Sequence, residues 1–172
     1  MQTKWLAIAF ALLTLALSGC GFALRGSSYG VAAHYQPLYI AADRESQILS
    51  QALQRQLEIN GVDTTQRRTK AKLIVEVTLL RKERRSIALD REARDAEYAL
   101  FERARLALRS PDGKFKRGPI TLEQRRIIVN DPDNPVGEQT ETDIVRAEMR
   151  EQLGVRLAQQ VEYWTRDNGE AH

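Results

Sequence analysis

The chain has 172 residues, a formal net charge of +3, and 28% of its residues are Asp, Glu, Lys or Arg. Its single cysteine excludes an intramolecular disulfide, and its two histidines, His34 and His172, lie far apart, so neither a metal nor a cofactor is expected. The charge excess is also too small for a protein whose partner is nucleic acid.

The first part of the chain has the pattern of an export signal. An apolar or small run of thirteen residues follows Lys4, which suits a signal-peptide core and is too short for a good membrane span. Two small residues then lead to Cys20. This stretch resembles a bacterial lipobox, and the resemblance implies cleavage before Cys20 and acylation of that residue. We therefore expect residues 1–19 to be a lipoprotein signal peptide.

The residues after Cys20 indicate where the anchored protein resides. Bacterial lipoproteins kept at the inner membrane often carry Asp at the next position, whereas this chain has Gly21. By resemblance to that sorting rule, we expect lipid anchoring at the periplasmic face of the outer membrane. Residues 20–36 are expected to be the lipidated N-terminus and a tether to the folded domain. Residues 26–36 contain Gly, Ser and Ala and few large apolar side chains, which is typical of a tether. The alternative is an ordinary signal peptide whose cut site happens to precede a cysteine.

Residues 37–166 are predicted to form a single domain, which is a suitable length for one hydrophobic core. A short strand is predicted at 38–41, and three- and four-residue apolar spacing predicts a helix over 43–61. From Leu73 onward, odd-numbered positions are mostly apolar, then charged, then apolar again up to Leu89. This alternation predicts one long strand whose far end projects beyond the core.

The second half of the domain is predicted to add two strands and a helix. The expected elements are a charged turn at 90–94, strands at 96–109 and 120–129, a turn at 110–113, a loop at 130–135, and a helix capped by residues 140–143 that ends near Trp164. Residues 167–172 are expected to be a frayed polar tail. These elements predict an α+β fold with two helices packed on one face of a four-stranded, largely antiparallel sheet.

No motif in the sequence indicates catalysis. The chain lacks a nucleophile elbow, a Walker loop and a dinucleotide-binding glycine motif, and its one thiol is assigned to lipidation. Glu102 is the carboxylate that falls among apolar positions of its strand, but carboxylate catalysis needs a second group nearby. We expect a protein that is not an enzyme; an unrecognised pair of carboxylates is the alternative.

Basic residues cluster on the hairpin that the two long strands are predicted to form. They include Arg84 and Arg85 at one end and Arg91 and Arg94 at the turn. Guanidinium groups bind phosphates through paired, charge-assisted hydrogen bonds, and lipopolysaccharide is the obvious polyanionic amphiphile of the periplasm. An equally weighted alternative is a solvated strand end whose charges prevent edge-to-edge aggregation.

Three segments together resemble the family of the lipopolysaccharide-assembly lipoprotein LptE. The sequence Cys20-Gly21-Phe22-Ala23-Leu24-Arg25-Gly26 is similar to the family's opening, except that other members often have His at the position of Ala23. The helix from Leu49 that ends at Asn60-Gly61-Val62 resembles the first helix of the family. Arg91 with Ala96-Glu97-Tyr98 looks like the family's Ala-Glu-Tyr segment. A second difference from the family is the short tail after Trp164.

The resemblance implies a function as well as a fold. Members of the family have two helices on a four-stranded sheet, plug the lumen of the outer-membrane β-barrel LptD, and assist barrel assembly and lipopolysaccharide delivery. We therefore expect LptD and lipopolysaccharide as partners. Lipid A phosphates are expected to contact Arg91, carried over from the family motif, with Arg94, Arg84 and Arg85 added by proximity. The alternative is a lipid-anchored accessory subunit of another envelope lipid transporter.

Overall fold

The computed structural model describes residues 30–129 and 135–166. The expected signal peptide, Cys20, most of the tether, residues 130–134 of the expected 130–135 loop and the 167–172 tail lie outside these ranges. Among the described residues, no helix combines the length and the apolar character needed to cross a bilayer.

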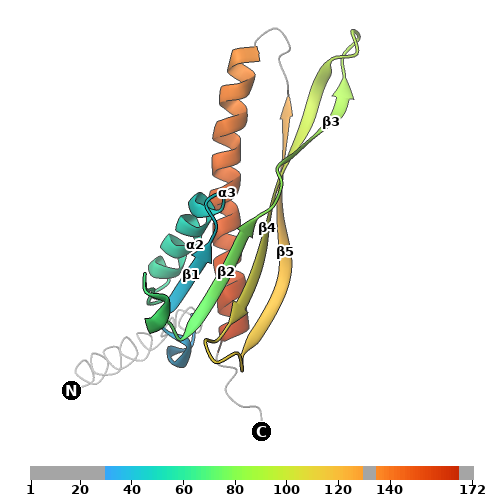
Figure 1. Ribbon diagram of the computed structural model, residues 1–172. Coiled ribbons are helices and arrows are strands. Elements are labelled where there is room, and N and C mark those ends of the chain that lie inside the picture. Colours follow the sequence, from blue (N-terminus) through green and yellow to red (C-terminus); the bar gives the residue numbers. More distant parts are fainter. Residues whose placement is uncertain (1–29, 130–134, 167–172) are drawn as a thin grey trace, which may run out of the picture.

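The domain consists of a mixed five-stranded sheet with two long helices on one of its faces (Figure 1). The strands are β1 (Leu38–Ala42), β2 (Leu73–Leu79), β3 (Glu83–Leu89), β4 (Asp95–Arg109) and β5 (Lys116–Val129). The helices are α2 (Gln47–Ile59) and α3 (Pro135–Thr165), with short 3-10 helices η1 (Ala33–Tyr35) and η2 (Arg68–Lys70). The predicted α+β class, with two helices on a largely antiparallel sheet, is confirmed.

Strand β4 is the centre of the sheet. One of its edges pairs with β5 along nearly its whole length. Its other edge pairs with β2 near its C-terminal end and with β3 near its N-terminal end, both antiparallel. Strand β1 adds to β2 in parallel. With fifteen residues in β4 and 31 in α3, each of these elements spans about 45–50 Å, which gives the molecule its elongated shape (Figure 1).

The prediction of one continuous strand over 73–89 is wrong, because β2 and β3 are separated by a bulge. Leu79 lies opposite Ala104 and Glu83 lies opposite Phe101, so four residue steps on this edge face three on β4. One extra residue reverses the side-chain alternation beyond it. The apolar residues that were expected to resume the buried pattern, Ile87 and Leu89, are exposed. The sheet therefore has five strands instead of the predicted four.

Three other predicted boundaries differ from the structure. Helix α3 begins at Pro135, so residues 140–143 lie inside it and do not cap it. Strand β5 begins at Lys116, four residues before the predicted start. Helix α2 begins at Gln47, because Asp43 accepts the Ser46 N–H at 2.9 Å in a turn that precedes the helix. The Ser46 hydroxyl in turn accepts the N–H of Leu79 at 2.7 Å and fixes the helix to the end of β2.

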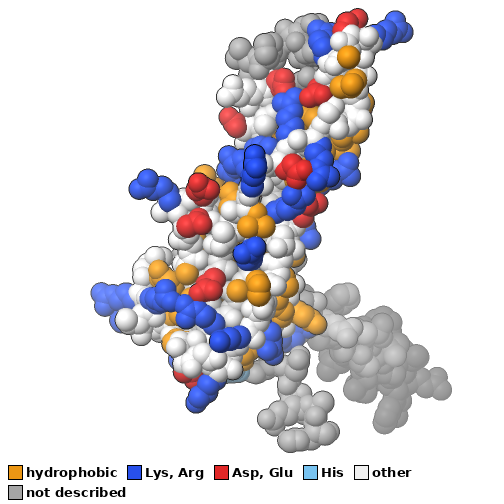
Figure 2. Space-filling view, turned by 45° about the vertical axis from the view of Figure 1, so that its right-hand side comes forward, with side chains coloured by type: hydrophobic (Ala, Val, Ile, Leu, Met, Phe, Trp, Pro, Cys, Tyr) orange, Lys and Arg blue, Asp and Glu red, His pale blue; other side chains and the backbone are white. Residues whose placement is uncertain are grey.

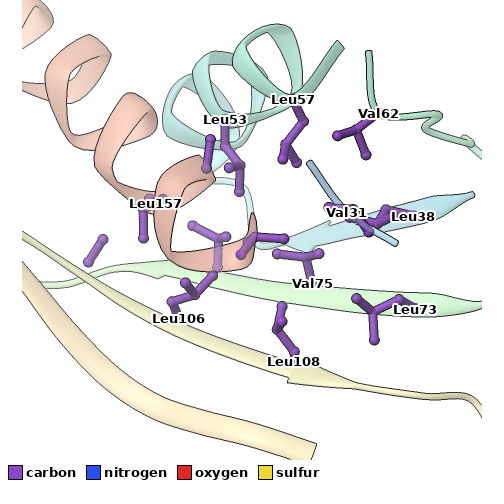
Figure 3. Packing of buried hydrophobic residues seen from close by; sticks show 14 of the residues in the cluster. Val31, Leu38, Leu53, Leu57, Val62, Leu73, Val75, Leu106, Leu108 and Leu157 are labelled. Carbon is purple, nitrogen blue, oxygen red and sulfur yellow. The ribbon is translucent and has the colours of Figure 1, made fainter. Parts of the chain in front are cut away.

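Two apolar clusters hold the helices on the sheet. The larger fills the lower half of the molecule between α2, α3 and strands β1, β2 and β4 (Figure 3). The smaller joins Tyr98, Leu100, Ile128 and Met149 in the upper half. Val31 belongs to the larger cluster, and the N–H of Ala32 donates to the carbonyl of Thr165 at 3.1 Å. The packed body thus starts several residues before position 37.

Candidate functional site

The helices leave one face of the sheet uncovered, and we call it the open face. Along β4 the even-numbered residues point to the helices: the Tyr98 hydroxyl, for example, lies 2.8 Å from the Thr142 hydroxyl of α3. The alternate residues and their cross-strand partners therefore form the open face. In the upper half these are Glu83 and Arg85 of β3, Glu97, Ala99, Phe101, Arg103 and Arg105 of β4, and Thr121, Glu123, Arg125, Ile127 and Val129 of β5.

An aromatic ring surrounded by arginines lies at the centre of the open face. The guanidinium carbons of Arg85, Arg103 and Arg125 lie 5.1, 5.3 and 5.9 Å from the centre of the Phe101 ring. These cations come from three adjacent strands and are attracted to the negative face of the ring. Beside them, Ile127 is 53% exposed and Val129 is 74% exposed. The surface thus combines cationic groups with exposed apolar side chains.

Carboxylates fix part of this arginine arrangement. Glu83 pairs with Arg85 and with Arg103, whose Nη1 lies 2.6 Å from Glu83 Oε2. Arg103 Nε also lies 2.5 Å from Glu123 of β5. Hydrogen bonds from Arg85, and then from Arg103, hold the pKa of Glu83 below its ordinary value. Arg125 contacts no carboxylate within the described ranges, so its cation remains available to a partner.

Two of the four predicted phosphate-binding residues lie together in the β3–β4 turn. Arg94 Nε lies 2.8 Å from Asp90 Oδ2, and Asp90 Oδ1 accepts the backbone N–H of Arg94 at 2.8 Å. These bonds, chiefly the one from the backbone N–H of Arg94, lower the pKa of Asp90. Arg94 therefore shapes the turn. Arg91 is exposed at the tip, and no ion pair holds it among the described residues.

The other two predicted residues lie away from the tip and on opposite faces of the sheet. Arg85 belongs to the open face, whereas the Arg84 guanidinium lies 3.7 Å from the centre of the Tyr98 ring on the helix side. Arg84 also lies 2.5 Å from Glu138 of α3 and 3.4 Å from Asp95. Five residues of β3, 85–89, separate Arg84 from the turn, which places its backbone about 20 Å from Asp90. The structure thus does not gather the four arginines at one point.

Sequence reasoning missed a buried ionic cluster between α3 and β4. Glu102 has no exposed surface, and its Oε1 lies 2.8 Å from Arg146 Nη1 and 3.3 Å from Arg150 Nη2. Arg146 also donates to the carbonyl of Glu83 at 3.2 Å, just beyond the bulge. The available signals were the apolar neighbours of Glu102 and the four-residue spacing of the two arginines, which places both on one face of α3.

Two surface pockets flank the bulge between β2 and β3. One, of about 510 Å³, reaches Glu45 and Arg150 on the helix side, and the other, of about 440 Å³, reaches Glu83 and Arg103. Both are lined by residues 81 and 82 of the bulge. Within 30–129 and 135–166, no three His, Cys, Asp or Glu side chains gather as a metal site requires.

Comparison with known proteins decides the family. The family model described as "LptE: Lipopolysaccharide-assembly" matches residues 35–161, which is most of the chain. The chain belongs to the LptE family. It is therefore a member of a family of non-catalytic assembly lipoproteins of the cell envelope, and the prediction that it is not an enzyme is confirmed.

Individual relatives agree with this membership. The chain is 24% identical over 161 residues to the LPS-assembly lipoprotein LptE of Photorhabdus laumondii, covering 94% of this chain and 87% of the relative. It is 25% identical over 162 residues to LptE of Pectobacterium atrosepticum, covering 94% and 86%.

Solved structures share the fold. Lipoprotein B from Nitrosomonas europaea matches with a TM-score of 0.67 at 18% identity, covering 84% of this chain and 92% of that one. Rare lipoprotein B from Shewanella oneidensis matches with a TM-score of 0.61 at 24% identity, covering 72% and 91%. The LptE-family fold described above is thus found in other solved lipoproteins.

Proposed function

We propose that this LptE-family chain is anchored at the periplasmic face of the outer membrane, where it plugs and helps assemble an LptD-like β-barrel and assists delivery of lipopolysaccharide to the outer leaflet. Cys20 is the proposed site of acylation, because the lipobox-like stretch ends at this one cysteine. Two or more acyl chains on it give stable anchoring, which a single chain does not provide.

The observation that carries the proposal is the character of the open face on an elongated domain. Large transmembrane barrels have polar interiors, so a plug needs a surface that is compatible with water and charge along its length. On the visible face in Figure 2, Lys and Arg side chains alternate with Asp and Glu along the molecule. The exposed Ile127 and Val129 add apolar contact area beside the arginines of the open face.

The proposed contact with lipid A phosphate centres on Arg91 at the tip of the β3–β4 turn. Its exposed guanidinium is not engaged by a carboxylate of the described chain, so it retains its donors for a phosphate. Arg94 supports it by fixing the turn through Asp90. Arg84 and Arg85 are secondary candidates in this proposal, since carboxylates and aromatic rings already engage both.

Charge reversal at the tip tests the lipopolysaccharide contact. We expect Arg91→Asp to weaken binding of lipopolysaccharide by the mature protein about tenfold or more, because a charge-assisted contact is replaced by repulsion. Arg44→Asp is the matched control, since Arg44 is also exposed and outside any ion pair of the described residues. Binding is measured with labelled lipopolysaccharide in detergent, with circular dichroism to verify folding. Equal binding by the two folded variants would remove Arg91 from the site.

A further inference from the structure

The lower end of the domain forms a continuous surface that the proposed function does not use. It consists of the segments 30–37, 62–72, 110–117 and 164–166, and we call it the basal surface. The N–H of Lys72 donates to the carbonyl of Pro37 at 2.9 Å, and the rings of Tyr35 and Phe115 lie 4.7 Å apart. These contacts hold the segments together as one end of the molecule (Figure 1).

The basal surface is strongly basic. Its segments contain eight Lys or Arg residues and two acidic residues, Asp63 and Asp112. Four of the cations, in and beside η2, are exposed and form no ion pair within the described part of the chain: Arg67, Arg68, Lys70 and Lys72. By contrast, Arg103 and Arg109 of the sheet are each held by a carboxylate. Figure 2 shows several basic side chains at this lower end.

The described chain begins at the same end. Val31 is buried in the core there, and the backbone bond from Ala32 to Thr165 fixes the start of the domain to the basal surface. Ten residues, 21–30, separate this point from Cys20. Even a fully extended segment of that length spans only about 36 Å. An acylated Cys20 would therefore hold the basal surface close to the membrane that contains its acyl chains.

We propose that the basal surface binds the anionic phospholipid headgroups of the membrane that holds the anchor. This inference rests on the proposed anchor at Cys20 and on neither the barrel nor lipopolysaccharide. Lys70 and Lys72 carry compact, strongly hydrated charges on flexible stems, and the cations are spread over several loops. Such an arrangement suits a diffuse layer of negative charge better than one stereospecific phosphate. Docking would hold the basal end of the elongated domain at the headgroup layer, with the β3–β4 turn at the opposite end of the domain (Figure 1).

Vesicle binding of a non-acylated protein tests the proposal. The mature chain from residue 20 carries Cys20→Ser, so that no acyl chain contributes. We expect it to sediment with vesicles of phosphatidylcholine and phosphatidylglycerol mixed two to one, not with pure phosphatidylcholine vesicles, and to bind less as salt rises. Replacing the four cations at 67, 68, 70 and 72 with Ser should weaken binding about a hundredfold, since each basic residue near an anionic surface strengthens binding about fivefold and not all reach it at once.

A charge-matched control distinguishes binding by the basal surface from binding that depends only on the net charge of the protein. Serine replacement of four exposed cations elsewhere, Arg44, Arg81, Lys82 and Arg126, removes the same charge and should leave binding within about threefold of the parent protein. Arg67→Lys with Arg68→Lys should also retain binding, because the positive charge is kept, and circular dichroism of the four-serine variant verifies that it is folded. Absence of parental binding to the anionic vesicles, or equal losses in both sets of four, would overturn the proposal. Because the assay contains no barrel and no lipopolysaccharide, its failure leaves the proposed function untouched.

Discussion

Glu102 is a charged residue without any exposed surface, placed where α3 crosses the middle of β4. Two arginines share its Oε1, so the cluster carries a net positive charge inside the structure. Its other oxygen, Oε2, and the Nε of Arg150 have no hydrogen-bond partner among the described residues. Buried ion pairs of this kind are costly to break but are often no better than apolar packing, because burying the charges removes their hydration.

Substitutions in this cluster have opposite expected effects. Glu102→Ala should lower the free energy of unfolding by about 3–5 kcal/mol, because it leaves two arginines in the interior without their carboxylate. Replacing all three charges, as Glu102→Leu with Arg146→Met and Arg150→Leu, should restore stability to within about 1 kcal/mol of the parent or exceed it. Urea unfolding measures both. The control Glu123→Ala, at an exposed pair, should change stability by less than about 1 kcal/mol.

Glu83 predicts how the fold responds to acid. Hydrogen bonds from Arg85 and Arg103 hold its pKa in the folded state below its ordinary value of 4.5. Because the folded pKa is the lower one, this carboxylate contributes its full stabilisation above pH 4.5 and loses it as the pH falls towards the folded pKa. The free energy of unfolding, measured from pH 7 downward, should therefore decrease below about pH 4.5. In the Glu83→Gln variant, the free energy of unfolding should decrease less steeply with falling pH than in the parent protein. An equal slope in the two proteins would contradict this role of Glu83.

At the scale of elements, α2 and α3 cross unusually closely at one glycine. A Cβ on Gly154 would lie 2.8 Å from the Cβ of Ala52, and 3.1 Å from the backbone C of Ala52 and N of Leu53. The first contact is closer than side chains tolerate, and the other two involve backbone that cannot rotate away. The absence of a side chain at Gly154 therefore sets the separation of the two helices and the packing of the apolar cluster beneath them.

Gly154→Ala should destabilise the domain even though alanine favours a helix. The gain in helix propensity is about 1 kcal/mol, and the forced displacement of the helices is expected to exceed it, for a net loss of about 1–2 kcal/mol. Ala52→Gly removes the closest contact but itself costs about 1 kcal/mol of helix propensity. A double-mutant cycle should therefore show that the two substitutions together destabilise the domain less than the sum of their separate effects. Equal or greater stability of Gly154→Ala alone would show that the helices separate without cost.

The sequence predicts the elements well and their pairing less well. Alternation along β4 places Tyr98, Leu100 and Leu106 on the side that faces the helices, and all three are buried. It does not predict the burial of Ala99 and Phe101 on the other side of the strand. The bulge between β2 and β3 has no local signal, since the residues on both sides keep one apparent alternation. The bulge arises because β2 and β3 pair with β4 in registers that differ by one residue. The same limit hides the partners of Glu102, which lie on a helix more than forty residues away.

The bulge also explains why the candidate site differs from the prediction. Beyond it the alternation is reversed, so Arg84 points to α3 and Arg85 to the open face. If residues 73–89 formed one unbroken strand, the alternation would place Arg85 on the helix side and Arg84 on the open face. The turn residues Arg91 and Arg94 were correctly expected to lie close together, because sequence neighbours in a tight turn cannot separate. Their different roles depend on Asp90, whose carboxylate engages Arg94.

At the scale of the whole molecule, its two ends have different chemistry. The lower end holds both described termini, the larger apolar cluster and the four cations at 67, 68, 70 and 72, which form no ion pair with another described residue. The upper half presents the open face with its arginines around Phe101 and leads to the β3–β4 turn (Figure 1). An anchor near one end and a charged turn at the other suit a protein that is held at a membrane and reaches into a partner.

The most direct test of the central claim is to isolate the tagged, acylated protein from detergent-solubilised outer membranes and identify its partners by mass spectrometry. We predict recovery of a large β-barrel in a one-to-one ratio, and weaker recovery when exposed open-face residues are changed, as in Ile127→Asp with Val129→Asp. Ile48→Asp with Ile59→Asp, at two exposed apolar positions of α2, is the control and should retain the barrel. Recovery of the protein alone, or with subunits of an inner-membrane transporter, would contradict the proposed plug function.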